Sequence, residues 1–121
     1  MAKKNVFVVD DDESVCRALK MLLQSYDFQV ETFNSADVFF LKVPESTPGC
    51  LILDIHMPGT DGWATLQRLY SVGSTRRVII MSAEKNGGLK DKVLKAGAVG
   101  FFQKPVNDKD LVGLITQAGS Y

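Results

Sequence analysis

Short apolar runs alternate along this chain with longer stretches in which apolar residues recur at helical spacing. The β-branched run Val6–Val9 stops abruptly at a block of acids and predicts a first buried strand. Similar runs predict strands at Cys50–Asp54, Val78–Met81 and Ala98–Phe102, because an apolar run without polar alternation is typical of a strand covered on both faces. The segment Phe28–Thr32 alternates more, so its strand is expected nearer a sheet edge.

Helical periodicity fills the intervals between the strands. Gly97 is expected to end the fourth helix, and the composition of Ala83–Gly88, with adjacent glycines, predicts a flexible segment before that helix. The helices are expected to begin at Asp12 or Glu13, at Asn34 or Ser35, near Gly62, near Leu89, and at Asn107 or Asp108. Their expected apolar positions include Val15, Leu19, Leu22, Leu23, Tyr26, Ala36, Val38, Phe39, Phe40, Leu41, Trp63, Leu66, Leu69, Tyr70, Leu89, Val93, Leu94, Ala96, Leu111, Leu114, Ile115 and Ala118.

This alternation of strands and helices predicts an α/β fold in which a (βα) unit occurs five times. Such chains form a parallel sheet with helices on both faces, and right-handed crossovers orient all the strands the same way. The chain has 121 residues, 45% of them hydrophobic and 23% charged, which suits one core and leaves no room for a second. We therefore predict a single domain over 1–121, with its core at about 5–118.

Composition excludes several classes of partner. The formal net charge is zero, which gives no general reason to expect nucleic-acid or membrane binding. No apolar run approaches the roughly 20 residues of a membrane span, no signal peptide is evident at the start, and no basic recognition helix is present. Cys16 and Cys50 form no CxxC pair and are expected to be reduced, packed thiols. We expect a cytoplasmic protein without membrane or direct nucleic-acid contact.

Polar residues follow four of the five predicted strands. Asp10 and Asp11 follow the first strand, Asp54 ends the third, Ser82 follows the fourth, and Lys104 follows the fifth. Because the carboxyl ends of parallel strands share one edge, these five residues should lie together, at the edge where open α/β sheets bind ligands.

The residue types at this edge indicate phosphoryl transfer. Crowded carboxylates need a countercharge, and oxygen ligands suit Mg²⁺, with Mn²⁺ as an alternative. Zinc is disfavoured because His56 is the one histidine nearby. A carboxylate such as Asp54 is already ionised at neutral pH and can attack phosphorus without a general base, while the cation, Lys104 and Ser82 neutralise the phosphoryl oxygens.

Four motifs in this order resemble the receiver domain of two-component response regulators. They are Val8–Asp11, Asp54–Gly62, Met81–Ala83 and Lys104–Pro105, and the similarity runs from about Asn5 to Ala118. The DIxMPGxDG form of the second motif and the Phe101–Phe102 pair most resemble receivers of nitrogen-fixation and quorum-sensing helix-turn-helix regulators. The resemblance implies a doubly wound (βα)5, flavodoxin-like three-layer sandwich with a five-stranded parallel sheet of order 2-1-3-4-5.

Matched by position, the resemblance also implies site roles. Asp54 would accept a phosphoryl group from a phosphohistidine of a sensor histidine kinase or phosphotransfer protein. Asp11, Asp54 and the main-chain carbonyl of His56 would ligate Mg²⁺, and Asp10 would support the ion mainly through water. Lys104 would pair with Asp54 and then with the phosphoryl group.

The remaining implications concern switching. Ser82 would bond a phosphoryl oxygen and Phe101 would rotate inward, which changes the surface of the fourth helix, fifth strand and fifth helix. That surface would control an output, expected to be transcription, through a domain or partner outside this chain, and it is a candidate homodimer interface. The Lys104–Pro105 peptide is expected to be cis. Such a chain is a signalling switch, either stand-alone or part of a longer regulator, and not a turnover enzyme.

Other functions fit the residues less well. A flavodoxin-like binder of flavin or nucleotide would need a Ser/Thr/Gly-rich loop after the first strand, where this chain has four acids. A haloacid-dehalogenase-type phosphatase would need a second Asp where His56 stands. An unphosphorylated pseudo-receiver stays an alternative, although every matched acceptor position is intact. His56 and Glu84 either steer a hydrolytic water or are solvated loop residues.

Overall fold

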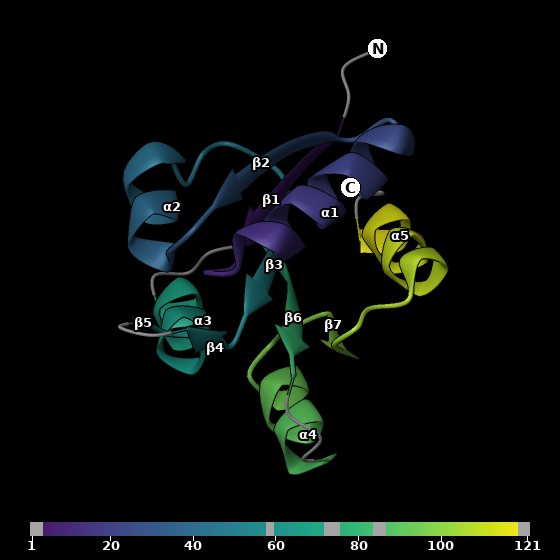
Figure 1. The fold of residues 1–121 in the computed structure, drawn as a ribbon. Helices are drawn as coiled ribbons and strands as arrows, with labels where there is room; N and C mark the ends of the chain where they lie inside the picture. The colour runs from purple at the N-terminus through teal and green to yellow at the C-terminus, as the bar shows by residue number, and fades with distance from the viewer. Residues whose placement is uncertain (1–3, 58–59, 72–75, 84–86, 119–121) are drawn as a thin grey trace.

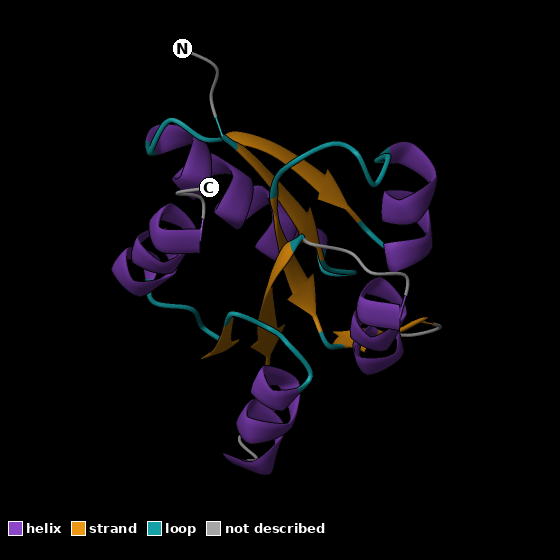
Figure 2. Cartoon of the chain, turned by 180° about the vertical axis from the view of Figure 1, so that it is seen from behind, coloured by secondary structure: helices purple, strands orange, loops and turns teal. Residues whose placement is uncertain are grey.

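The fold is a five-stranded parallel sheet with helices on both faces, as Figures 1 and 2 show. The computed structural model describes residues 4–57, 60–71, 76–83 and 87–118. The sheet has the order β2-β1-β3-β6-β7, which is the predicted 2-1-3-4-5 arrangement, with β2 at an edge. The elements are β1 (Asn5–Val9), α1 (Glu13–Ser25), β2 (Gln29–Phe33), α2 (Ala36–Lys42), β3 (Cys50–Asp54), β4 (His56–Met57), β5 (Thr60–Asp61), α3 (Gly62–Ser71), β6 (Arg77–Ser82), α4 (Gly87–Lys95), β7 (Gly100–Gln103) and α5 (Asp108–Ala118).

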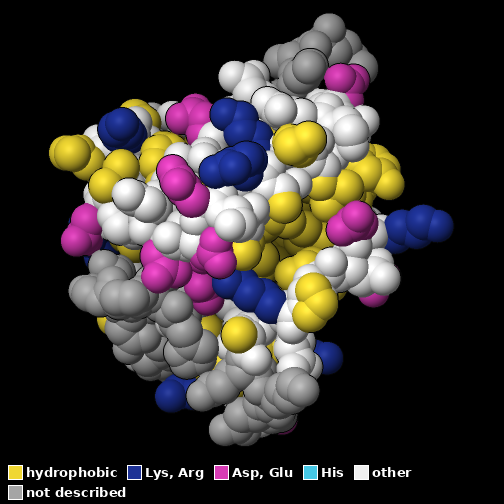
Figure 3. All heavy atoms as spheres, in the orientation of Figure 1, with side chains coloured by type: hydrophobic (Ala, Val, Ile, Leu, Met, Phe, Trp, Pro, Cys, Tyr) yellow, Lys and Arg dark blue, Asp and Glu magenta, His cyan; other side chains and the backbone are white. Residues whose placement is uncertain are grey.

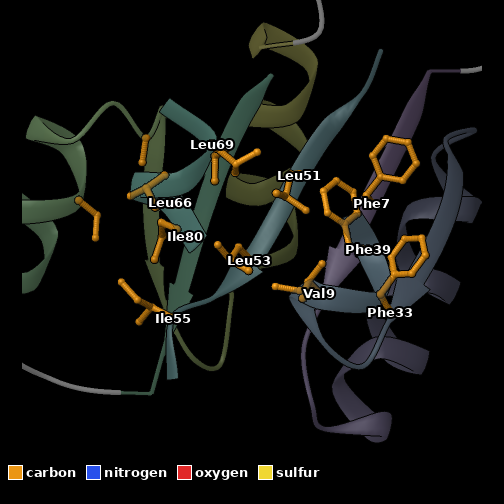
Figure 4. Close-up of a cluster of buried hydrophobic side chains, with 14 of the residues drawn as sticks. Phe7, Val9, Phe33, Phe39, Leu51, Leu53, Ile55, Leu66, Leu69 and Ile80 are labelled. Carbon is orange, nitrogen blue, oxygen red and sulfur yellow. The ribbon is translucent and has the colours of Figure 1, made fainter. Parts of the chain in front are cut away.

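Two apolar cores form because successive strand residues point to opposite faces of the sheet. One core joins the sheet to α2, α3 and α4, and includes Phe7, Phe39 and Leu66 (Figure 4). The other joins the opposite face to α1 and α5, and includes Leu23 and Ile115. All five residues of β3 are buried, so Asp54 stands at the end of a strand that both layers hold in place.

Polar caps fix where three helices begin, and they settle three alternatives left open by the sequence. Asp12 is the N-cap of α1, where its Oδ1 accepts hydrogen bonds from the amides of Ser14 and Val15 at 2.8 and 3.4 Å. These bonds lower the pKa of the Asp12 carboxyl. Ser35 caps α2 through Val38, and the Oδ1 of Asn107 accepts from the amide of Asp110 at the start of α5.

Several predicted boundaries and burials were wrong. Helix α4 begins at Gly87, within the stretch predicted to be a flexible segment. Tyr26 lies beyond the end of α1 and is exposed, and Leu41 of α2 is 84% exposed. Leu94 of α4 is also exposed, because a short helix buries only a narrow stripe of side chains. Strand β7 begins at Gly100, two residues later than predicted.

A short antiparallel pair, β4 with β5, was not predicted. Its strands hold only two residues each, too few to show a period in the sequence. The pair follows Asp54 directly through Ile55, and its second strand immediately precedes α3.

Gly49 lies in tight contact with Phe7 and Asn5 just before β3. A Cβ at this position would come within 2.5 Å of the Phe7 ring and 3.0 Å of the Asn5 carbonyl oxygen. We expect Gly49→Ala to lower the free energy of unfolding by about 1–3 kcal/mol, because the buried ring has little room to move. Urea denaturation measures the loss.

Gly113 of α5 is the matched control, since a Cβ there meets nothing within 4 Å. Gly113→Ala should raise stability by about 0.5–1 kcal/mol through helix propensity. Equal effects of the two substitutions would contradict the packing described at Gly49.

Candidate functional site

The carboxyl edge of the sheet gathers the predicted polar side chains. Asp10 directly follows β1, Asp54 ends β3, and Ser82 ends β6, while Lys104 directly follows β7. The parallel registers align these ends: Val9 lies opposite Leu53, Asp54 opposite Met81, and Ser82 opposite Gln103. Asp10, Asp54 and Ser82 are buried, although they lie at the rim of the sheet.

Lys104 connects two of the carboxylates. Its Nζ lies 2.7 Å from Oδ2 of Asp10 and 3.2 Å from Oδ2 of Asp54. The sequence led us to expect the pair with Asp54, but the shorter contact is made with Asp10. Burial by itself would lower the pKa of Lys104, but the hydrogen bond and charge of Asp10, together with the charge and hydrogen bond of Asp54, raise it above its ordinary value.

Three carboxylates converge beside this lysine. Oxygen atoms of Asp10, Asp11 and Asp54 lie within 4.8 Å of one another, with Asp11 the exposed member. One lysine cannot neutralise three acids, and a set of carboxylate oxygens is the donor type that Mg²⁺ prefers. The residues present therefore fit a magnesium site that is open to solvent on the side of Asp11.

Asp10 is held by its own neighbours in the chain. Its Oδ1 accepts a hydrogen bond of 2.9 Å from the amide of Asp12, so the N-cap of α1 also orients this carboxylate. The buried thiol of Cys16 donates to the Asp10 main-chain carbonyl at 3.3 Å. The sequence predicted only a packing role for Cys16, because nothing in the residue pattern indicates that a thiol in the first turn of α1 reaches back to the Asp10 carbonyl.

The two proposed switch residues lie on neighbouring strands. The carbonyl of Ser82 accepts a hydrogen bond of 2.8 Å from the amide of Lys104, which ties the end of β6 to the lysine. Phe101 is half-buried and packs against the core beneath α2, α3 and α4, whereas Phe102 packs against the opposite core. The two rings therefore lie on opposite faces of the sheet.

Two predictions fall partly or wholly outside the described residues. The backbone of His56 lies in β4, but its side chain lies outside the described part of the structure, as does all of Glu84. Their expected roles in hydrolysis stay predictions. The expected cis Lys104–Pro105 peptide is confirmed.

An apolar groove adjoins Lys104 on the side of α1 and α5. It has a volume of about 530 Å³, and Leu19, Leu22 and Val106 are among its walls. Figure 3, seen from the same side as Figure 1, shows an apolar hollow between these helices beside a group of acidic side chains. The apolar groove therefore borders the acidic site at Lys104.

The fold and this acidic site define a receiver domain. Residues 6–116 match the family described as response regulator receiver domain, and the chain belongs to that family. Membership makes it a signalling protein, and its acidic cluster is typical of receiver Mg²⁺ sites. No helix in the described residues is both long and apolar enough to pass through a membrane.

Two curated proteins and one crystal structure are similar to this chain over most of its length. The chain is 39% identical over 113 residues to response regulator protein TodT of Pseudomonas putida, covering 93% of this chain and 50% of TodT. It is 34% identical over 116 residues to transcriptional regulatory protein FixJ of Bradyrhizobium diazoefficiens, covering 96% and 57%. A crystal structure of FixJ-N matches with a TM-score of 0.89 at 29% identity, covering 100% of this chain and 97% of that one. The chain thus spans about half the length of these two curated relatives.

Proposed function

We propose that this chain is a phosphorylation switch in which Asp54 accepts a phosphoryl group from a histidine kinase or phosphotransfer protein. The observation that carries the proposal is the convergence of Asp10, Asp11 and Asp54 beside the Lys104 ammonium group. In the transfer, an Asp54 carboxylate oxygen attacks phosphorus, and the bond from phosphorus to the donor histidine nitrogen breaks. The product is an acyl phosphate on Asp54, held as a signal.

The neighbouring residues take complementary roles in this proposal. Asp11, Asp54 and the main-chain carbonyl of His56 would hold Mg²⁺, and Asp10 would support the ion mainly through water. When bound, Mg²⁺ neutralises charge on the phosphoryl oxygens. Lys104 already lies 3.2 Å from Asp54 and is placed to pair with a phosphoryl oxygen.

The proposal also includes a switching step. The hydroxyl of Ser82 bonds a phosphoryl oxygen, and Phe101 turns inward against the core that it already touches. The surface formed by α4, β7 and α5 changes as a result, and serves as the interface for an output partner or a second copy. Because FixJ is named as a transcriptional regulatory protein, we propose transcription in the cytoplasm as the output, exerted through a part or partner that contacts DNA in place of this chain.

The direct test is incubation with acetyl phosphate, followed by intact-mass measurement. With Mg²⁺ present, the wild-type chain should gain the mass of one phosphoryl group, and hydroxylamine should remove it because acyl phosphates are labile to that nucleophile. Chelation with EDTA should prevent the gain, since the phosphoryl charge is then uncompensated. A chain that gains no mass in Mg²⁺ would contradict the proposal and favour a pseudo-receiver.

A further inference from the structure

A second cavity lies at the edge of the sheet opposite the aspartates. Its volume is about 370 Å³, within the range of small-molecule sites. The walls come from the loop between α2 and β3 and from the residues that begin β6. They are Glu45, Ser46, Thr47, Pro48, Gly49, Arg76 and Arg77.

The loop that forms one wall is fixed at several points. The Asn5 side chain donates to the Pro48 carbonyl at 3.2 Å, and the Thr47 amide donates to the Pro44 carbonyl at 3.0 Å. Gly49 packs so closely against Phe7 that a Cβ would not fit. The cavity is therefore largely preformed, and a ligand would not have to order this wall on binding.

Arg76 places a buried positive charge in the wall. It is only 7% exposed, and its Nη1 and Nη2 donate to the carbonyls of Thr47 and Pro44 at 2.9 and 3.2 Å. Its guanidinium also lies over the rings of Phe7 and Phe39, 5.4 Å from each centroid. The charge is held in one position, in surroundings that screen it less than water would.

Arg77, the next residue, also lines the cavity and is exposed. Ser46 and Thr47 add hydroxyl-bearing side chains, while Glu45 is the single acid among the lining residues. Two arginines beside two hydroxyls are suited to a phosphate group, because guanidinium forks and hydroxyls donate to its oxygens.

We propose that this cavity binds a small phosphate-bearing anion, as free phosphate or as a phosphate monoester. The site is separate from the aspartates, since its walls lie before β3 and at the start of β6, whereas Asp54 and Ser82 end those strands. It leaves the acyl-phosphate chemistry unobstructed, and an anion there would link the loop before β3 to the start of β6.

The test is a titration of the ¹⁵N-labelled chain with inorganic phosphate, and in parallel with glycerol 3-phosphate. EDTA keeps metal away from the aspartates, whose own charge then repels the anion, and sodium chloride at equal ionic strength is the reference. Amide signals of residues 45–49 and 76–77 should shift saturably. Tighter binding of the monoester would identify an organic phosphate as the ligand, and equal binding would identify free phosphate; both support the proposal.

Substitutions at three exposed residues show whether the anion binds in this cavity. Arg77→Gln should weaken binding about fivefold or more, and Glu45→Gln should tighten it about twofold to fivefold, because each changes one charge in the wall. Arg17→Gln on α1 removes the same charge outside the cavity and should change the affinity less than about twofold. No saturable shift, or equal weakening by Arg17→Gln and Arg77→Gln, would overturn the proposal.

Discussion

Asp54→Asn is expected to abolish the acyl phosphate that acetyl phosphate and Mg²⁺ form on the wild-type chain. The amide that replaces the carboxylate is a far weaker nucleophile, and it removes one charge from the metal site. Its size and shape match those of aspartate, so the fully buried strand β3 should stay intact. Intact mass over a time course, with circular dichroism as the folding check, measures the effect.

Asp37→Asn is the matched control for this substitution. Asp37 is an exposed residue in the first turn of α2, far along the chain from the carboxylate cluster. This variant should gain one phosphoryl group at the wild-type rate. An adduct of wild-type yield on Asp54→Asn would place the acceptor at another residue and would refute the assignment of Asp54.

Lys104→Ala should produce the largest loss of stability in the metal-free protein. Lys104 is the cation next to Asp10, which is fully buried, and Asp54, which is 4% exposed. Removing one partner of a buried charge pair leaves the other uncompensated, so we expect the free energy of unfolding in EDTA to fall by about 2–4 kcal/mol. Added Mg²⁺ should stabilise the variant more than the wild type, because it binds only the folded cluster and no longer meets a competing ammonium group.

The pH dependence of this effect has a definite sign. The pKa of Lys104 is raised in the folded chain, so its contribution is complete below the ordinary value of 10.5 and is lost as the pH rises through the folded value. The stability difference between wild type and Lys104→Ala should therefore shrink in strongly alkaline solution. Lys95→Ala, in the last turn of α4, serves as the control and should change stability by less than about 0.5 kcal/mol. Equal stability of Lys104→Ala and wild type in EDTA would contradict the pairing.

The sequence predicted the edge at which the site forms, because strand ends in a parallel sheet follow from the order of apolar runs. It placed Asp10, Asp54, Ser82 and Lys104 together without any knowledge of side-chain positions. It did not predict that Lys104 lies closer to Asp10 than to Asp54, since that choice depends on rotamers and on the amide of Asp12.

The sequence did not predict the shortest strands, the exposed side of α2 or the cavity beside Arg76. The two-residue strands β4 and β5 are too short to show a period. Leu41 looked like a core residue from its spacing, but α2 has only seven residues and turns this side chain to solvent. The cavity beside Arg76 and Arg77 was also invisible in the sequence, where its two walls are about thirty residues apart.

The contact between Lys104 and Asp10 joins residues near opposite ends of the sequence, which matters while the chain is being synthesised. The two residues are 94 positions apart, and the strand that delivers Lys104 is the last one in the sheet. A nascent chain that has folded only its first three βα units would hold the acceptor carboxylate without the lysine. The ion pairs of Lys104 with Asp10 and Asp54 can therefore form only once the last strand of the sheet is in place.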